Sequence, residues 1–93
     1  MKNKFMTRAI ELSIESVNTG GGPFGSVIVK DEKIIAEGFN KVTSTNDPTA
    51  HGEIVAIRKA CKSLNNFNLS GCELYSTCEP CPMCLSEIGR AHV

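Results

Sequence analysis

Two short motifs that lie far apart in the sequence carry the residue types of one metal site, and this feature constrains the fold most. The first motif holds His51 and Glu53, and the second holds Cys81 and Cys84. Zinc takes imidazole and thiolate ligands in a tetrahedron, and three protein ligands leave the fourth position open for a catalytic water. Glu53 is too close in sequence to His51 to be an obvious fourth ligand, but it could exchange protons with that water. We therefore expect a fold that brings the two motifs together.

The hydrophobic pattern predicts an α/β domain. Apolar residues recur three to four positions apart in the expected helices, and they form short β-branched runs in the expected strands. The expected order is helix 3–18, strand 24–29, strand 34–42, helix 49–64, strand 73–76 and a last helix that begins at Cys81. Residues 43–49 are expected to form a polar loop, with Thr49 as the N-cap of the second helix. This order is typical of an α/β sandwich with a mixed sheet.

Both motifs fall at the start of an expected helix, which matters for their chemistry. Cys81 and Cys84 are three residues apart, so one helical face would present both sulfur atoms to a single metal ion. The unpaired N–H groups and positive dipole end of a helix N-terminus favour an anion. An ionised Glu53 or a developing oxyanion would be stabilised there.

The composition limits the possible partners and the compartment. The chain has 93 residues, enough for one small domain, and its 10 basic residues equal its 10 acidic residues. A neutral chain gives no compositional evidence for a nucleic-acid surface. The 5 cysteines, an odd number without a hydrophobic leader, favour metal thiolates in a reducing cytoplasm over a secreted disulfide scaffold. We also expect no membrane segment, because no apolar run is long enough to span a bilayer.

Each cysteine also has a simpler interpretation. The Pro-Cys-x-x-Cys motif alone is equally typical of a redox pair or of a zinc knuckle. Cys78 could be a fourth ligand, which would make the site structural instead of catalytic. Cys61 and Cys72 are expected to be small buried hydrophobic residues.

Residues 46–53 (NDPTAHGE) and 78–84 (CEPCPMC) resemble the zinc-binding motifs of the cytidine deaminase superfamily. Within it the similarity is greatest to bacterial guanine deaminases, with bacterial tRNA adenosine deaminases as close relatives. Residues 22–25 and 38–40 resemble the same two groups. The resemblance implies a cytidine deaminase-like three-layer α-β-α sandwich with a mixed sheet, from which the C-terminal strands and helices are missing. It also implies a homodimer for the complete enzyme.

The resemblance implies roles for individual residues. His51, Cys81 and Cys84 would bind one zinc ion per chain, and Glu53 would be the catalytic proton shuttle. For substrate contacts, Asn40 would hydrogen-bond to the edge of the base and Phe24 would stack on its face, although the residues alone equally allow a turn for Asn40 and core packing for Phe24. The implied reaction is hydrolytic deamination of a nucleobase, with guanine to xanthine favoured. The alternatives are tRNA adenosine deamination, or an inactive zinc-binding fragment of either enzyme.

Two features depart from the family pattern. Gly52 stands where the family has alanine, and a glycine within a helix costs about 1 kcal/mol relative to alanine. Residues 1–86 would be the N-terminal part of a single deaminase domain, whereas residues 87–93 lose the resemblance. These seven residues can be encoded by GAG ATC GGA AGA GCA CAC GTC, which matches a common sequencing adapter. We therefore expect a non-native tail after Ser86, and little or no activity from this 93-residue chain.

Overall fold

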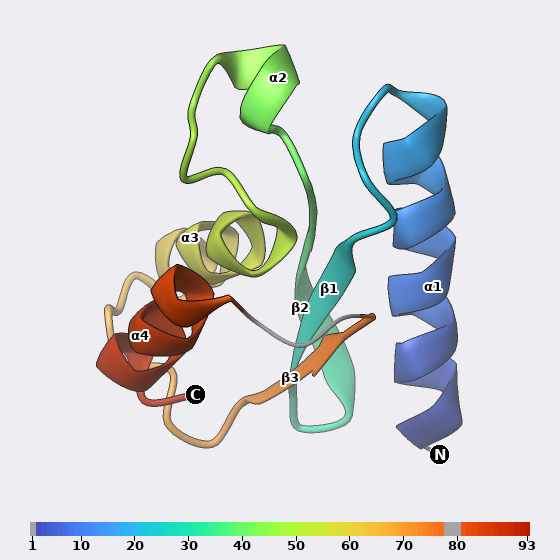
Figure 1. Ribbon diagram of the computed structural model, residues 1–93. Helices are drawn as coiled ribbons and strands as arrows, with labels where there is room; N and C mark the ends of the chain where they lie inside the picture. The colour runs from blue at the N-terminus through green and yellow to red at the C-terminus, as the bar shows by residue number, and fades with distance from the viewer. Residues whose placement is uncertain (1, 78–80) are drawn as a thin grey trace.

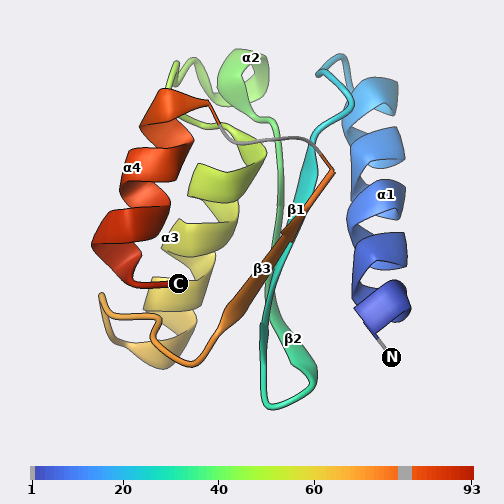
Figure 2. The same ribbon diagram turned by 60° about the horizontal axis from the view of Figure 1, so that its bottom comes forward.

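A three-stranded sheet forms the middle layer of the protein, with helices on both faces (Figures 1 and 2). The computed structural model describes residues 2–77 and 81–93. Helix α1 (Lys2–Asn18) covers one face of the sheet, and α3 (Gly52–Leu64) and α4 (Pro82–Ala91) lie together on the other. The strands are β1 (Gly25–Lys30), β2 (Lys33–Phe39) and β3 (Glu73–Ser76), and a short helix α2 (Val42–Thr45) follows β2. The expected three-layer α/β architecture is confirmed.

Strand β1 lies at the centre of the sheet and pairs antiparallel with β2 and with β3. The turn between β1 and β2 holds Asp31 and Glu32, which both have positive φ angles, 52° and 65°. Such a two-residue turn matches the right-handed twist of the strands that it joins. Within the described residues every strand pair is antiparallel, so this part of the chain does not contain the parallel pairing of the expected mixed sheet.

Side chains of β1 alternate between two hydrophobic clusters, as the period of a strand requires. Val27 and Val29 point toward α1 and pack with Phe5 and Leu12 of that helix. Ile28 points to the opposite face and joins the cluster beneath α3 and α4. The buried members of that second cluster are Ile28, Ala36, Ala56, Ile57, Ala60, Leu69 and Ala91.

Helix α3 begins later than the sequence pattern predicts, and the preceding loop contains a helical turn. His51, not Thr49, is the N-cap residue, because the Thr49 hydroxyl and N–H both donate to the Asp47 carboxylate. The predicted loop 43–49 contains most of α2. Strand β2 ends at Phe39, before the predicted end at residue 42, and the side-chain oxygen of Asn40 accepts the N–H of Val42.

Gly38 sets how closely α3 approaches the sheet. A Cβ atom at Gly38 would lie 2.4 Å from the carbonyl oxygen of Gly52 and 2.6 Å from the amide nitrogen of Ala56. No side chain fits in that space, so the first turn of α3 rests directly on the backbone of β2. This contact places the start of α3 over one end of the sheet.

The expected non-native tail continues α4. The helix runs to Ala91, which is buried and whose carbonyl oxygen accepts the N–H of Leu69 at 2.7 Å. The origin of residues 87–93 is a property of the gene, so it stays a prediction. In the described part of the chain, no helix combines the length and apolar character needed to cross a membrane.

Candidate metal centre

The two motifs meet because α3 and α4 lie side by side and begin at the same end of the sheet (Figure 2). His51 is the N-cap residue of α3, and Cys81 is the N-cap residue of α4. Neither side chain makes a capping hydrogen bond to its own helix. Cys84 lies in the first turn of α4, one turn after Cys81. Both N-cap side chains are therefore available for a ligand between the helices.

The spacing of the three donor atoms fits tetrahedral zinc. The Nδ1 atom of His51 lies 3.6 Å from the Sγ atom of Cys81 and 3.6 Å from the Sγ atom of Cys84. In a tetrahedral site with Zn–S near 2.3 Å and Zn–N near 2.05 Å, a sulfur and a nitrogen ligand are about 3.6 Å apart. All three donor atoms lie within 4.8 Å of one another. The structure thus brings together the three residues expected to bind the metal.

The two thiols differ in their surroundings. Burial raises the pKa of Cys84, whose side chain is fully inaccessible to solvent, to about 12. The pKa of Cys81 is lowered, mainly by the backbone N–H of Cys84 in the first turn of α4. A helix N-terminus stabilises a thiolate in this way. Because cysteine binds a metal as the thiolate, metal binding here has to displace a proton from Cys84.

Glu53 lies in the first turn of α3 and is only 6% exposed. Its charge is one of the smaller influences on both thiols, because it adds to the raised pKa of Cys84 and partly offsets the lowered pKa of Cys81. Among the described residues, Glu53 is not part of the group of atoms that could hold the metal. Three ligands with a buried carboxylate beside them match a catalytic site with an open position. Cys78, the alternative fourth ligand, lies outside the described residues.

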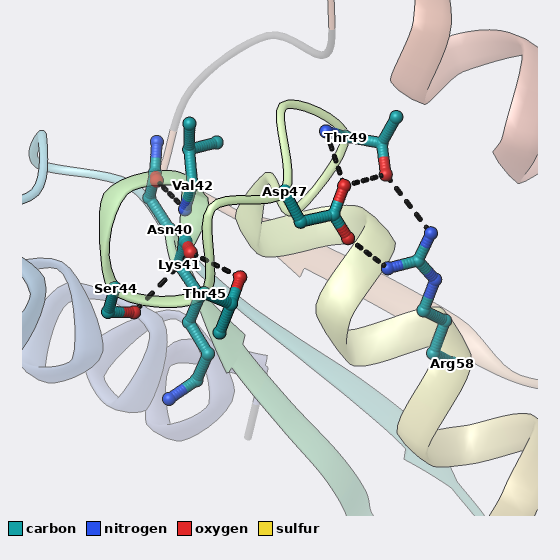
Figure 3. A network of polar contacts seen from close by, with 8 residues as sticks. All are labelled: Asn40, Lys41, Val42, Ser44, Thr45, Asp47, Thr49 and Arg58. Carbon is teal, nitrogen blue, oxygen red and sulfur yellow. Dashed lines mark hydrogen bonds and ion pairs between the residues drawn. The ribbon is translucent and has the colours of Figure 1, made fainter.

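The two residues expected to contact substrate lie at the strand ends nearest this centre. The carbonyl oxygen of Phe24 and the Cα atom of Phe39 each lie 3.5 Å from the position that a Cβ atom would occupy at Gly52, the residue after His51. Asn40 directly follows Phe39, and its Oδ1 accepts the N–H of Val42 at 2.9 Å (Figure 3). Its side-chain NH2 group is the part that can donate to a ligand. The substrate contacts of Asn40 and Phe24 stay predictions.

One group of polar contacts beside the centre was not predicted from the sequence. The Asp47 carboxylate accepts hydrogen bonds from the N–H and hydroxyl of Thr49, at 2.9 and 2.7 Å, and pairs with Arg58 at 3.0 Å (Figure 3). These contacts, of which those to Thr49 contribute most, lower the pKa of Asp47 from 3.8 to about 2. The Asp-Pro-Thr sequence is a signal for a local turn of this kind. The pairing with Arg58 has no local signal.

The family model for the cytidine and deoxycytidylate deaminase zinc-binding region matches residues 1–93. Guanine deaminase from Bacillus subtilis (strain 168) is 64% identical over 85 residues, which are 90% of this chain and 54% of that protein. Its X-ray structure superposes with a TM-score of 0.91 at 61% identity, over 94% of this chain and 56% of that one.

Proteins that act on tRNA are also similar. The tRNA-specific adenosine deaminase from Aquifex aeolicus (strain VF5) is 45% identical over 83 residues, covering 89% of this chain and 55% of that protein. A structure from a study of A-to-I editing by tRNA:A34 deaminases gives a TM-score of 0.97 at 38% identity, over 99% of this chain and 71% of that one. The chain spans about half the length of the curated relatives described here.

Proposed function

Because this chain belongs to the cytidine and deoxycytidylate deaminase family, we propose that it carries the zinc centre of a hydrolytic deaminase that converts guanine to xanthine. The observation that carries the proposal is the cluster of His51, Cys81 and Cys84 beside the buried Glu53. Bound to these ligands, zinc would lower the pKa of a coordinated water to about 7 and make hydroxide available near neutral pH.

Residues of the chain would supply proton transfer and hold the base. Glu53 would accept a proton from the water as the water oxygen attacks the ring carbon that carries the amino group, and would give that proton to the adjacent ring nitrogen. It would then pass a second proton to the amino group, so that ammonia leaves as the C–N bond breaks. The reaction balances as guanine plus water giving xanthine plus ammonia. The NH2 group of Asn40 would hold an acceptor on the base edge, and the ring of Phe24 would stack on its face. The N-termini of α3 and α4, which are the positive ends of the helix dipoles, would stabilise negative charge that develops on the oxygen bound to the attacked carbon.

Guanine is favoured over tRNA adenosine by two observations. The identity is 64% to the B. subtilis guanine deaminase and 45% to the A. aeolicus tRNA deaminase. The chain has no net charge, whereas RNA binding draws on several contacts from Lys and Arg to phosphates. The second candidate is nevertheless a tRNA adenosine deaminase, because the tRNA:A34 deaminase structure superposes at 0.97. We further propose a cytoplasmic enzyme whose complete form is a homodimer, as the family's dimers imply.

The test is ammonia release from guanine by a chimera that joins residues 1–86 to the remaining C-terminal part of the B. subtilis guanine deaminase. We expect Glu53→Gln to reduce this rate by about 100-fold to 10,000-fold, because it removes general acid–base catalysis. Zinc content should be unchanged, since Glu53 is not a ligand. Glu15→Gln on the exposed side of α1 is the matched control and should retain full activity.

The outcomes separate the three candidates. A zinc-loaded chimera that releases no ammonia from guanine, or one whose activity survives Glu53→Gln, would contradict the proposal. Inosine formation in a tRNA anticodon stem-loop by the 93-residue chain would favour the second candidate instead. If that chain binds zinc but deaminates neither substrate, it is the inactive fragment of a deaminase.

A further inference from the structure

The loop that leads into His51 is bound to the body of α3 by a polar cluster outside the metal ligands. The cluster consists of Asp47, Thr49 and Arg58 (Figure 3). One carboxylate oxygen of Asp47 binds both polar groups of Thr49, and the other accepts from Arg58 at 3.0 Å. Arg58 also donates to the hydroxyl of Thr49 at 3.1 Å. The three side chains thus form a closed set of contacts.

The cluster joins residues that lie before and after the candidate metal ligand His51 in the sequence. Asp47 lies four residues before His51, and Arg58 lies about two helical turns after it. Their ion pair therefore ties the beginning of the loop to α3 across His51. Only Ala50 separates the cluster's Thr49 from the ligand.

The backbone of the same segment is also held. The N–H of Ala50 donates to the carbonyl of Asp47 at 3.1 Å, and the N–H of His51 donates to the carbonyl of Thr49 at 2.8 Å. On the other side, Lys41 donates its N–H to the carbonyl of Ala50 at 2.8 Å. The side chain of Ala50 is buried, at 3% exposure. The segment that leads into His51 is therefore held by hydrogen bonds within the loop and by a hydrogen bond from Lys41.

We infer that Asp47 is a positioning residue that holds the His51 imidazole at ligand distance from Cys81 and Cys84. His51 has no capping bond that would orient it, so the loop geometry sets the direction of its side chain. If the loop were free to move, metal binding would have to order it, and the loss of conformational entropy would weaken the affinity for the metal. Partners that orient metal ligands typically change affinity by about 10-fold to 100-fold when removed. The inference rests on the zinc centre of the proposed function and not on its substrate.

The experiment measures Co2+ and Zn2+ binding by the 93-residue chain. Cobalt bound to two thiolates and an imidazole gives a visible absorption band, and zinc affinity follows from its displacement. We expect Asp47→Ala to weaken the affinity for both metals by about tenfold or more. Asp47→Asn keeps an oxygen acceptor for Thr49 and should retain part of the affinity. An unchanged affinity and cobalt spectrum in Asp47→Ala would overturn the inference.

Glu37→Gln is the matched control. It also removes a carboxylate paired with an arginine, but that pair joins α1 to β2 on the other side of the sheet. It should lower stability without changing metal affinity. If Asp47→Ala does not fold, as judged by circular dichroism, Arg58→Met replaces it. The Arg58 side chain is 58% exposed, so its loss should be tolerated and should still weaken binding several-fold. Equal affinity in Arg58→Met and the parent would then overturn the inference.

The parent chain distinguishes the two levels of the proposal. If the parent binds neither metal, the zinc centre itself is wrong. If the parent binds and the Asp47 variants bind equally well, only the positioning role is wrong. A double-mutant cycle between Asp47→Ala and Arg58→Met should give non-additive losses of affinity, because both changes break the same contact.

Discussion

Gly52 separates the metal ligand His51 from the buried Glu53 and is the first residue of α3. Its φ angle is not in the left-handed region, so its backbone conformation does not require glycine. A Cβ atom there would lie 3.5 Å from its nearest neighbours, which is ordinary van der Waals contact. At the residue scale, Gly52 therefore weakens the start of α3 without a steric reason for its presence.

We predict that Gly52→Ala raises the free energy of unfolding by about 0.5–1 kcal/mol, because alanine has less backbone entropy to lose. Urea denaturation of the apo chain measures the change. Gly38→Ala is the contrasting control, since its Cβ would lie 2.4 Å from the Gly52 carbonyl oxygen. That overpacking should destabilise by about 1–3 kcal/mol. A loss of stability in Gly52→Ala would show that the first turn of α3 needs glycine.

At the scale of elements, α1 is attached to the sheet by a hydrophobic face and by the ion pair between Arg8 and Glu37. Arg8 donates from Nε to Glu37 of β2 at 2.6 Å and from its second terminal nitrogen at 2.9 Å. Both side chains are about one-third exposed, which limits what the pair contributes. The hydrogen bonds from Arg8 lower the pKa of Glu37 below its ordinary value of 4.5.

We predict that Glu37→Gln lowers the free energy of unfolding by about 0.5–1 kcal/mol near neutral pH. Because the folded-state pKa of Glu37 is lowered, its stabilisation is fully present above pH 4.5 and is lost as the pH falls below that value. The difference between parent and variant in urea denaturation should therefore shrink in acid. A difference that stays constant or grows as the pH falls would contradict this role for the pair.

At the scale of the whole molecule, a metal ion in the candidate centre would join α3 to α4. Helix α4 packs against α3, and its last turn reaches the core through Ala91. At the other end, where both helices begin, the cluster of His51, Cys81 and Cys84 lies between them. A bound ion would connect residues 30 and 33 positions apart in the sequence. Metal binding and folding are then coupled.

We predict that zinc at about 100 times its dissociation constant stabilises the chain by about 2.7 kcal/mol, because the ion binds only the folded form. Thermal unfolding with and without EDTA measures this. The chelator should lower the Tm of the parent and of Cys72→Ala, a cysteine outside the metal cluster. It should have no effect on Cys84→Ala, which lacks a ligand. An equal response in all three proteins would place the metal elsewhere.

The sequence by itself determined the parts of the protein that depend on short-range patterns. Local patterns of apolar residues located α1, α3 and the three strands to within a few residues, and the proline and cysteine spacing of the second motif located the start of α4. The motif spacing also identified His51, Cys81 and Cys84, which the structure brings together. Metal ligands are few in kind, so their types and spacing are informative before any fold is known.

Only the tertiary structure decided the features that depend on contacts between distant residues. Thr49 has the chemistry of an N-cap, but its hydroxyl donates to Asp47 and accepts from Arg58 in the body of α3, and the helix starts at Gly52. The strand order β2-β1-β3 depends on pairing between residues about 50 positions apart. Which apolar residues of α1 face the sheet was decided in the same way, since Ile10 and Val17 are about half exposed. These features depend on packing between distant residues, and a local sequence pattern carries no information about such packing.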